Sequence, residues 1–168
     1  MVQSENDKMK TIKLTQGKVA IVDDNDFSLV SQHKWYACKC GNSFYAISTA
    51  RYRDNFGKLK RLSMHRMILG IVDGKIHADH KDCNGLNNTR KNLRICSMSE
   101  NQHNQRLRIS NTSGFKGVSW KEETKKWVAH IRLNYRKKHL GYFTSKELAH
   151  KAYCKAAVKL HGKFARFA

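Results

Sequence analysis

Lysine and arginine outnumber aspartate and glutamate by 33 to 13 in this chain of 168 residues, which leaves a formal net charge of +20 at pH 7. A compact fold crowds these charges together, so their repulsion opposes folding unless an anionic partner offsets it. Nucleic acid is the first candidate for that partner, and a membrane surface is the second. No apolar stretch is long enough to span a bilayer, and residues 1–10 lack the apolar run of a secretory signal. We therefore expect an intracellular protein without a membrane partner.

Two groups of possible metal ligands have commoner explanations. Of the five cysteines only Cys38 and Cys40 lie close together, whereas a structural zinc site usually takes two such pairs. Reduced thiols on strand residues are therefore favoured over zinc. Asp23, Asp24 and Asp26 could bind a metal, but a turn followed by a helix cap at Asp26 is the more frequent use of such residues.

Hydrophobic periodicity divides the chain into three zones. The first, residues 11–70, is β-rich, and the tight-turn pair Gly41-Asn42 joins two of its strands. The second, residues 75–107, combines short regular elements with a long polar loop. Its expected elements are a strand at 76–80, a loop at 81–92, a strand at 93–96 and a helix at 98–108 that starts from the Ser97-x-x-Glu100 capping box.

The third zone follows an expected linker at 109–114 and consists of three strands and one helix. Three strands are expected at 115–120, 127–133 and 138–143. A capping box at Thr144 and Glu147 starts a helix that Gly162 ends, with a core stripe running from Leu148 to Leu160. The sequence thus predicts an α+β protein that ends in a three-stranded antiparallel sheet packed on one helix.

Short polar side chains gather in the second zone. Asp79-His80, at the end of an expected strand, is followed by five asparagines: Asn84, Asn87, Asn88, Asn92 and Asn101. Asparagine favours turns for local reasons, so a structured loop without a function is the alternative. The expected order of strand, loop, strand and capped helix favours a site, because a helix side chain can then face the end of the first strand.

These residues carry a resemblance to a known family. The stretches 76–85, 92–94 and 99–101 resemble the HNH endonucleases, and are most similar to the phage and intron-encoded homing branch. The stretches 15–18, 22–24 and 64–66 resemble the N-terminal portion of such phage proteins. The resemblance implies a ββα-metal nuclease core at residues 62–108, within a first domain that covers residues 1–108.

The resemblance also implies a role for each polar residue. Asp79 and Asn101 would bind the metal, His80 would act as general base, and Asn92 would brace the loop. Many family members have histidine at the first and last positions, so this chain matches a homing subtype, with Asn104 and then His103 as other candidates for the second ligand. One carboxylate and one amide oxygen are hard ligands that suit Mg²⁺ or Mn²⁺.

The third zone resembles the plant ethylene-response-factor type of DNA-binding domain over residues 115–168, through the stretches 115–118, 127–132, 140–143 and 147–153. The resemblance implies that the sheet lies in the major groove of DNA. The side chains expected to face DNA are Lys116, Ser119, Lys121, His130, Arg132, Lys137 and His139. The family often has arginine at the first three of these positions, so base specificity is expected to be looser here.

The sequence therefore predicts a metal-dependent DNA endonuclease of the homing type, phage-encoded and acting in the host cytoplasm on double-stranded DNA. Whether it is a monomer or a homodimer, and so whether it nicks or cuts both strands, stays open. Basic residues of the first zone, among them Arg51, Arg53, Lys58, Lys60 and Arg61, could add phosphate contacts. The alternatives are a DNA-binding regulator with a decayed nuclease site, an RNA-binding protein and a basic packing protein.

Overall fold

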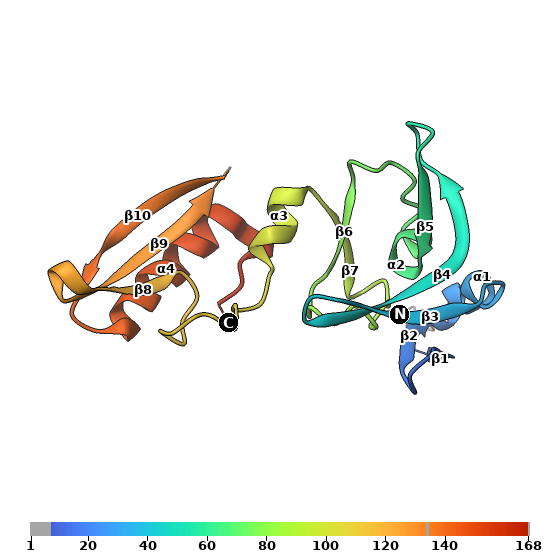
Figure 1. The fold of residues 1–168 in the computed structure, drawn as a ribbon, viewed down its shortest axis with the longest axis horizontal. Coiled ribbons are helices and arrows are strands. Elements are labelled where there is room, and N and C mark those ends of the chain that lie inside the picture. The colour runs from blue at the N-terminus through green and yellow to red at the C-terminus, as the bar shows by residue number, and fades with distance from the viewer. Residues whose placement is uncertain (1–7, 134, 168) are drawn as a thin grey trace, which may run out of the picture. The chain divides into compact units, whose positions relative to one another are not determined.

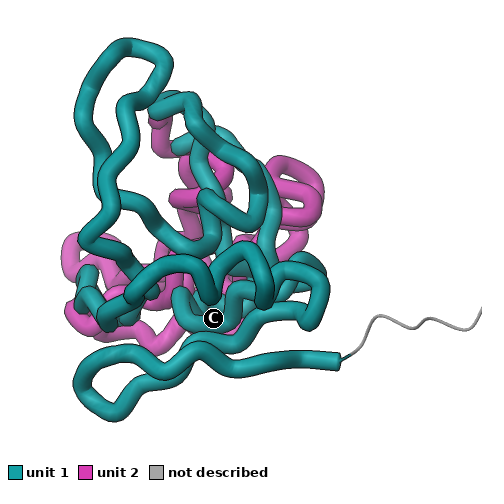
Figure 2. The backbone as a smooth tube through the Cα atoms, turned by 90° about the vertical axis from the view of Figure 1, so that its right-hand side faces the viewer, with its two compact units in different colours: residues 1–98 teal, residues 99–168 magenta. Residues whose placement is uncertain are grey.

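The computed structural model describes residues 8–133 and 135–167, and it divides into two compact units, Met1–Met98 and Ser99–Ala168 (Figure 2). Each unit combines helices with small antiparallel sheets, as expected for an α+β protein (Figure 1). The sequence instead places the domain boundary at a linker over residues 109–114, and that assignment stays a prediction. No helix among the described residues is both long and apolar enough to cross a membrane.

The described residues of the first unit form three small sheets and two short helices. Its elements are β1 (Met9–Lys13), β2 (Val19–Asp23), α1 (Asp24–Ser31), β3 (Trp35–Cys40), β4 (Ser43–Arg53), β5 (Leu59–Ser63), α2 (Met64–Ile68), β6 (His77–His80) and β7 (Leu93–Cys96). β1 pairs with β2, β3–β4–β5 form a meander, and β6 pairs with β7. Gly41 and Asn42 join β3 to β4, which confirms the predicted two-residue turn.

One apolar core holds these sheets together. It gathers Ala20 and Val22 of β2, Val30 of α1, Trp35 of β3, Ala46 of β4, Met64 and Ile68 of α2, and Leu93 of β7. Alternation along β2 buries Ala20 and Val22 completely, which is the period-two pattern of a strand with one face on a core. Because Leu93 opens β7 inside this core, the β6–β7 hairpin is anchored beside the meander.

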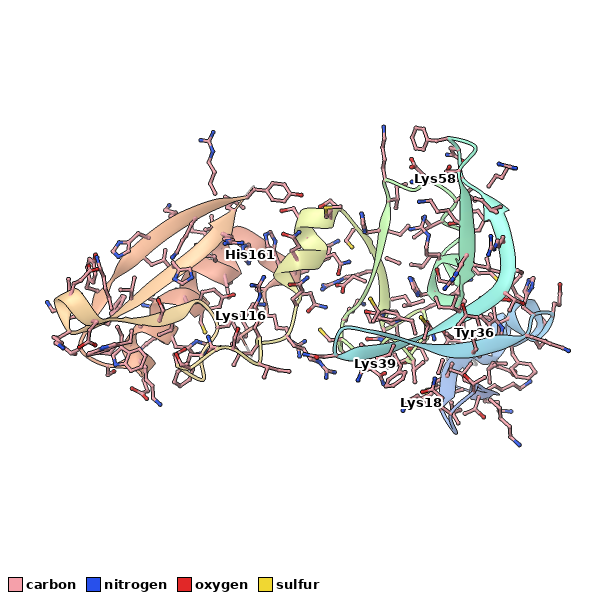
Figure 3. All side chains as sticks on the ribbon, viewed as in Figure 1. Lys18, Tyr36, Lys39, Lys58, Lys116 and His161 are labelled. Atoms are coloured by element: carbon pink, nitrogen blue, oxygen red, sulfur yellow. The ribbon has the colours of Figure 1, made fainter. Side chains whose placement is uncertain are left out.

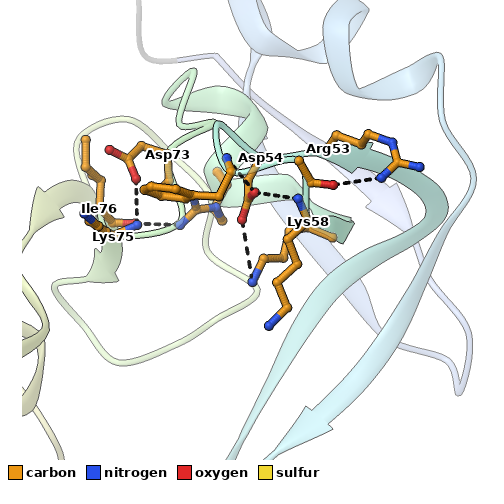
Figure 4. Close-up of polar contacts among 10 residues, drawn as sticks. Arg53, Asp54, Lys58, Asp73, Lys75 and Ile76 are labelled. Atoms are coloured by element: carbon orange, nitrogen blue, oxygen red, sulfur yellow. Dashed lines mark hydrogen bonds and ion pairs between the residues drawn. The ribbon is translucent and has the colours of Figure 1, made fainter.

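Polar contacts fix the segments on either side of α2 (Figure 4). Oδ1 of Asp54 accepts hydrogen bonds from the backbone N–H groups of Phe56 and Lys58, at 3.0 and 2.9 Å, and so closes the turn between β4 and β5. The Arg66 guanidinium donates to the carbonyls of Asp73 and Ile76, both at 2.7 Å. These two bonds tie α2 to the loop that leads into β6.

The second unit contains the predicted sheet and helix. Helix α3 (Met98–His103) crosses the boundary between the units, and β8 (Val118–Lys121), the 3-10 turn Glu122–Thr124, β9 (Lys126–Leu133), β10 (Arg136–Phe143), α4 (Lys146–His161) and the 3-10 turn Gly162–Phe164 follow. The strands form an antiparallel sheet in the order β10–β9–β8, and α4 packs on it through Ala149, Tyr153 and Ala157.

Three local expectations for α3 and α4 were wrong. The helix expected to reach Arg108 ends at His103, where the Lys116 ammonium binds the carbonyls of His103 and Gln105. The cap of α4 is Ser145, whose Oγ accepts from the N–H of Leu148, and not Thr144. Leu148 is 50% exposed and lies outside the core stripe. Gly162, at φ 51°, ends α4 as predicted.

Replacing Gly117 with alanine should destabilise the second unit, because a Cβ there would lie 2.2 Å from the Tyr153 ring and 2.7 Å from the His130 carbonyl oxygen. Its φ of 73° adds backbone strain, so we expect Gly117→Ala to cost about 3 kcal/mol of unfolding free energy. Gly114→Ala is the matched control, since Gly114 has φ 76° and open space around it. Equal losses for both variants in urea unfolding would contradict this packing argument.

Candidate functional site

The β6–β7 hairpin carries the Asp-His pair that the sequence singled out. Asp79 lies opposite Arg94 and His80 lies opposite Leu93, and the backbone N–H of Lys81 binds the carbonyl of Asn92 where the loop leaves the hairpin. The side chains of Asp79 and His80 are both buried. Two polar side chains at the end of one short strand are thus removed from most solvent, which strengthens every interaction they make.

Arg94 neutralises Asp79 across the hairpin. Its Nε lies 2.7 Å and its Nη2 2.6 Å from Oδ2 of the carboxylate, and both side chains are nearly enclosed. A buried ion pair of this kind is costly to break from one side, because the remaining charge is left without a partner. The sequence reasoning did not find Arg94, since its pairing depends on the strand register.

Asn88 fixes the proton of His80. The two side chains meet at 3.1 Å, between Nε2 of His80 and Oδ1 of Asn88. The other end of the Asn88 amide settles its orientation, because Nδ2 donates to the carbonyl of Leu86 at 3.2 Å and a carbonyl can only accept. Oδ1 therefore accepts from Nε2–H, and in the neutral imidazole Nδ1 carries the lone pair.

Burial keeps this histidine neutral. Loss of solvent lowers the pKa of His80, and the Asn88 hydrogen bond and the charges of Asp82 and Asp79 oppose that change without reversing it. The rings of His65 and Tyr45 pack around His80, at 5.1 and 5.8 Å between centroids. Burial, with His80 and Arg66 nearby, lowers the pKa of His65 to about 3. At pH 7 both rings are neutral.

Asn92 holds the loop between β6 and β7 in shape. Its Nδ2 donates to Oδ1 of Asp82 and to the carbonyl of Asn87, at 2.9 and 2.8 Å, while its Oδ1 accepts from the N–H of Asp82 at 3.1 Å. Burial acts to raise the pKa of Asp82, but hydrogen bonds from Asn84, Asn87 and Asn92 outweigh it and the pKa is lowered. These contacts are of the kind a bracing residue makes, and the catalytic role of Asn92 stays a prediction.

The expected second metal ligand lies in α3. Asn101 is half-buried there, in the second unit, whereas Asp79 is in the first, so their meeting at one metal ion stays a prediction. Of the other two candidates, Asn104 is buried, and His103 stacks on His161 with 3.6 Å between centroids. Burial, with His161 and Lys116 nearby, lowers the pKa of His103 to about 4.

Six of the seven side chains expected to face DNA share one face of the second unit's sheet. Ser119 and Lys121 alternate along β8, His130 and Arg132 along β9, and Lys137 and His139 along β10. The register pairs His130 with His139 and Arg132 with Lys137, so alternation places the six on the face opposite Val118, Ala129 and Ile131, which pack on α4.

Lys116 is the exception among the seven. It precedes β8, and its ammonium donates to the carbonyls of His103 and Gln105, at 2.7 and 2.6 Å (Figure 3). It lines, with His161, a pocket of about 550 Å³ within the second unit, together with Arg106, Arg108 and Arg132. The described residues that line this pocket include no aspartate or glutamate. A contact of Lys116 with DNA stays a prediction.

The other candidate ligands have structural partners. Asp26 accepts from Nε and Nη2 of Arg90, at 2.9 and 2.7 Å, and Asp23 accepts from the Arg90 backbone N–H at 2.7 Å. Asp23 and not Asp26 stands at the N-cap position of α1, so the expected cap was misplaced. The described residues contain no group of three histidine, cysteine or acidic side chains that could hold a metal, and all five cysteines are free thiols.

Acidification should destabilise the first unit through His65. Its folded pKa is about 3 against an ordinary value of 6.5, so below pH 6.5 the unfolded chain binds the proton first. The stability that the neutral ring contributes is complete above pH 6.5 and falls toward pH 3, by at most about 1.4 kcal/mol per pH unit. Urea unfolding between pH 6 and 4 should show a shallower pH dependence for His65→Gln. Equal slopes for the variant and the native protein would contradict the assignment.

Comparison with known proteins finds two viral relatives of this chain. The chain is 32% identical over 155 residues to an uncharacterized HNH endonuclease of Acanthamoeba polyphaga mimivirus, covering 89% of this chain and 74% of that protein. It is also 36% identical over 98 residues to protein 3.8 of Escherichia phage T7, covering 58% of this chain and 80% of the relative. No family model matches the chain, and no solved structure matches it. Because the first relative is matched over most of both chains, this protein belongs to the HNH endonuclease family.

Proposed function

We propose that this protein is a metal-dependent endonuclease that hydrolyses phosphodiester bonds in duplex DNA. The observation that carries the proposal is the buried, neutral His80, whose Nε2 proton is held by Asn88 and which directly follows Asp79. Membership of the HNH endonuclease family supports the same reading of these two residues. A histidine of this kind has the properties of a general base at neutral pH.

His80 acts through its second ring nitrogen. With the proton fixed on Nε2, the lone pair on Nδ1 accepts a proton from the water that attacks the phosphorus atom. The packed rings of Tyr45 and His65 limit rotation of the imidazole, and Asn88 prevents the other tautomer. Asn88 and the two rings are therefore positioning residues, because they act on the reaction through His80.

Asp79 and Asn101 would hold Mg²⁺ or Mn²⁺. A carboxylate and an amide oxygen are the hard donors that these ions take, and two protein ligands leave positions for waters and phosphate oxygens, so the donor set fits the ion. Bound there, the ion would stabilise negative charge on the phosphate and on the leaving 3′ oxygen. This role requires α3 to pack against the β6–β7 hairpin as the ββα core of the family does.

The sheet of the second unit would position the duplex. Its face of six polar and basic side chains suits the major groove. The pKa of His130 is lowered first by burial and then by the nearby Lys137, Arg132 and His139. Positive charge is therefore concentrated on this face, which supports an anionic partner. We further propose site-specific cleavage of the homing type by a phage gene product that acts in the host cytoplasm. That both relatives are viral proteins supports the last point.

A plasmid cleavage assay with Mg²⁺ tests the proposal. We expect the native protein to nick or linearise DNA and to stop when a chelator removes the metal. His80→Ala should bind DNA as tightly as the native protein and not cut it. Asn88→Ala allows the imidazole proton of His80 to occupy either ring nitrogen, so this variant should cut about 10- to 100-fold more slowly with unchanged binding. His33→Ala is the matched control, because the His33 ring packs on Trp35 and not on His80, and its loss should leave the rate unchanged.

Two results would contradict the proposal. If the native protein and His80→Ala both bind and neither cuts any DNA, including a library of candidate targets, the protein is a DNA-binding protein with a decayed nuclease site. If His80→Ala cuts as fast as the native protein, the base lies elsewhere. A preference for duplex RNA over duplex DNA in competition would favour an RNA-binding protein.

A further inference from the structure

The outer part of the β4–β5 hairpin is strongly basic. Figure 1 shows the two strands running together into their connecting loop. Residues 51–61 contain five cationic side chains and one acid, Asp54. Asp54 is buried and its Oδ1 is used by the backbone of the turn, so it does little to neutralise the outer surface. This segment of 11 residues therefore presents nearly uncompensated positive charge.

The strand register gathers three arginines on one face of this hairpin. Arg51 lies directly opposite Arg61, and Arg53, two residues further along β4, shares their face. All three side chains are exposed. No ion pair between described residues includes Arg51 or Arg61, and Arg53 donates only to the carbonyl of Gly57, at 2.7 Å. We call this the arginine face.

Such a pairing is unfavourable for the isolated protein. Like charges directly opposite each other on neighbouring strands destabilise a sheet, and long exposed side chains gain little from packing. The other face of the hairpin is arranged differently. Lys60, opposite Tyr52, is half-buried, and its ammonium lies 3.9 Å from Asp54. The arginine face has no opposite charge among the described residues, which is the arrangement expected where the opposite charge comes from a ligand.

We infer that the arginine face is a second DNA-binding surface, on which Arg51, Arg53 and Arg61 bind backbone phosphates of the duplex. Guanidinium groups match phosphate oxygens in planar, paired hydrogen bonds, and a two-stranded ribbon fits the width of the major groove. Phosphate contacts carry no sequence information, so this surface adds affinity and orientation and not base specificity. The inference rests on the proposed binding of duplex DNA and adds a contact in the unit that contains His80.

The salt dependence of binding counts the phosphates involved. We would titrate a fluorescent DNA duplex with the full chain, without Mg²⁺, at several salt concentrations and record anisotropy. The slope of log K against log salt is negative, and each lost phosphate contact reduces its magnitude by about 0.9. Arg51→Ser with Arg61→Ser should therefore reduce that magnitude by about 1.8 and weaken binding at least about tenfold. Thermal stability without DNA should be unchanged or higher, because the opposed charges are gone.

Two control variants separate a site from bulk charge. Lys151→Ser with Lys155→Ser removes the same charge from exposed positions on α4, a helix that packs on the face of the sheet away from the proposed DNA contacts, and should barely change the slope. Arg51→Lys with Arg61→Lys keeps the charge and should keep most of the slope. An unchanged slope in the arginine-to-serine variant, or an equal change in the α4 variant, overturns the inference. Absence of duplex binding by the native protein would instead overturn the proposed function.

Discussion

The arrangement around His80 depends on one buried amide. Asn88 is completely buried, and three of its polar groups have partners: its backbone N–H binds the carbonyl of Ile21, its Nδ2 binds the carbonyl of Leu86, and its Oδ1 binds His80. An amide so enclosed cannot turn over without leaving a donor unsatisfied, which costs on the order of 1–3 kcal/mol. The protonation of the imidazole is therefore determined by strand β2 and by the loop, and not by the histidine alone.

The same enclosure explains why charged and neutral groups lie side by side. Burial opposes charge on His65 and His80, so both rings are neutral at pH 7. Asp79 is buried as well, and it pairs with Arg94 across the hairpin. A neutral base next to a charged carboxylate is thus obtained by giving each group a different partner, Asn88 for the base and Arg94 for the acid.

Much of this fold was predictable, because local patterns govern it. The β3–β4 turn, the bounds of β7 and the sheet and helix of the second unit follow from turn residues and from periodicity. The partners of the candidate site were not predictable. Arg94 meets Asp79 through strand register, and Asn88 was one of several asparagines in the loop, distinguished only by its burial. The Lys116 ammonium binds the carbonyl of His103, the last residue of α3, from 13 residues further along the chain, and no local pattern reveals that contact.

The central claim is that Asn88 holds His80 as the Nε2–H tautomer, with the lone pair on Nδ1. Long-range nitrogen–proton NMR correlation of the imidazole, on the full-length protein at pH 7, measures this directly, because protonated and unprotonated ring nitrogens differ widely in chemical shift. The account predicts a protonated Nε2 and an unprotonated Nδ1 for His80, with the pattern lost in Asn88→Leu. A His80 ring that is protonated on Nδ1, or on both nitrogens, would contradict it.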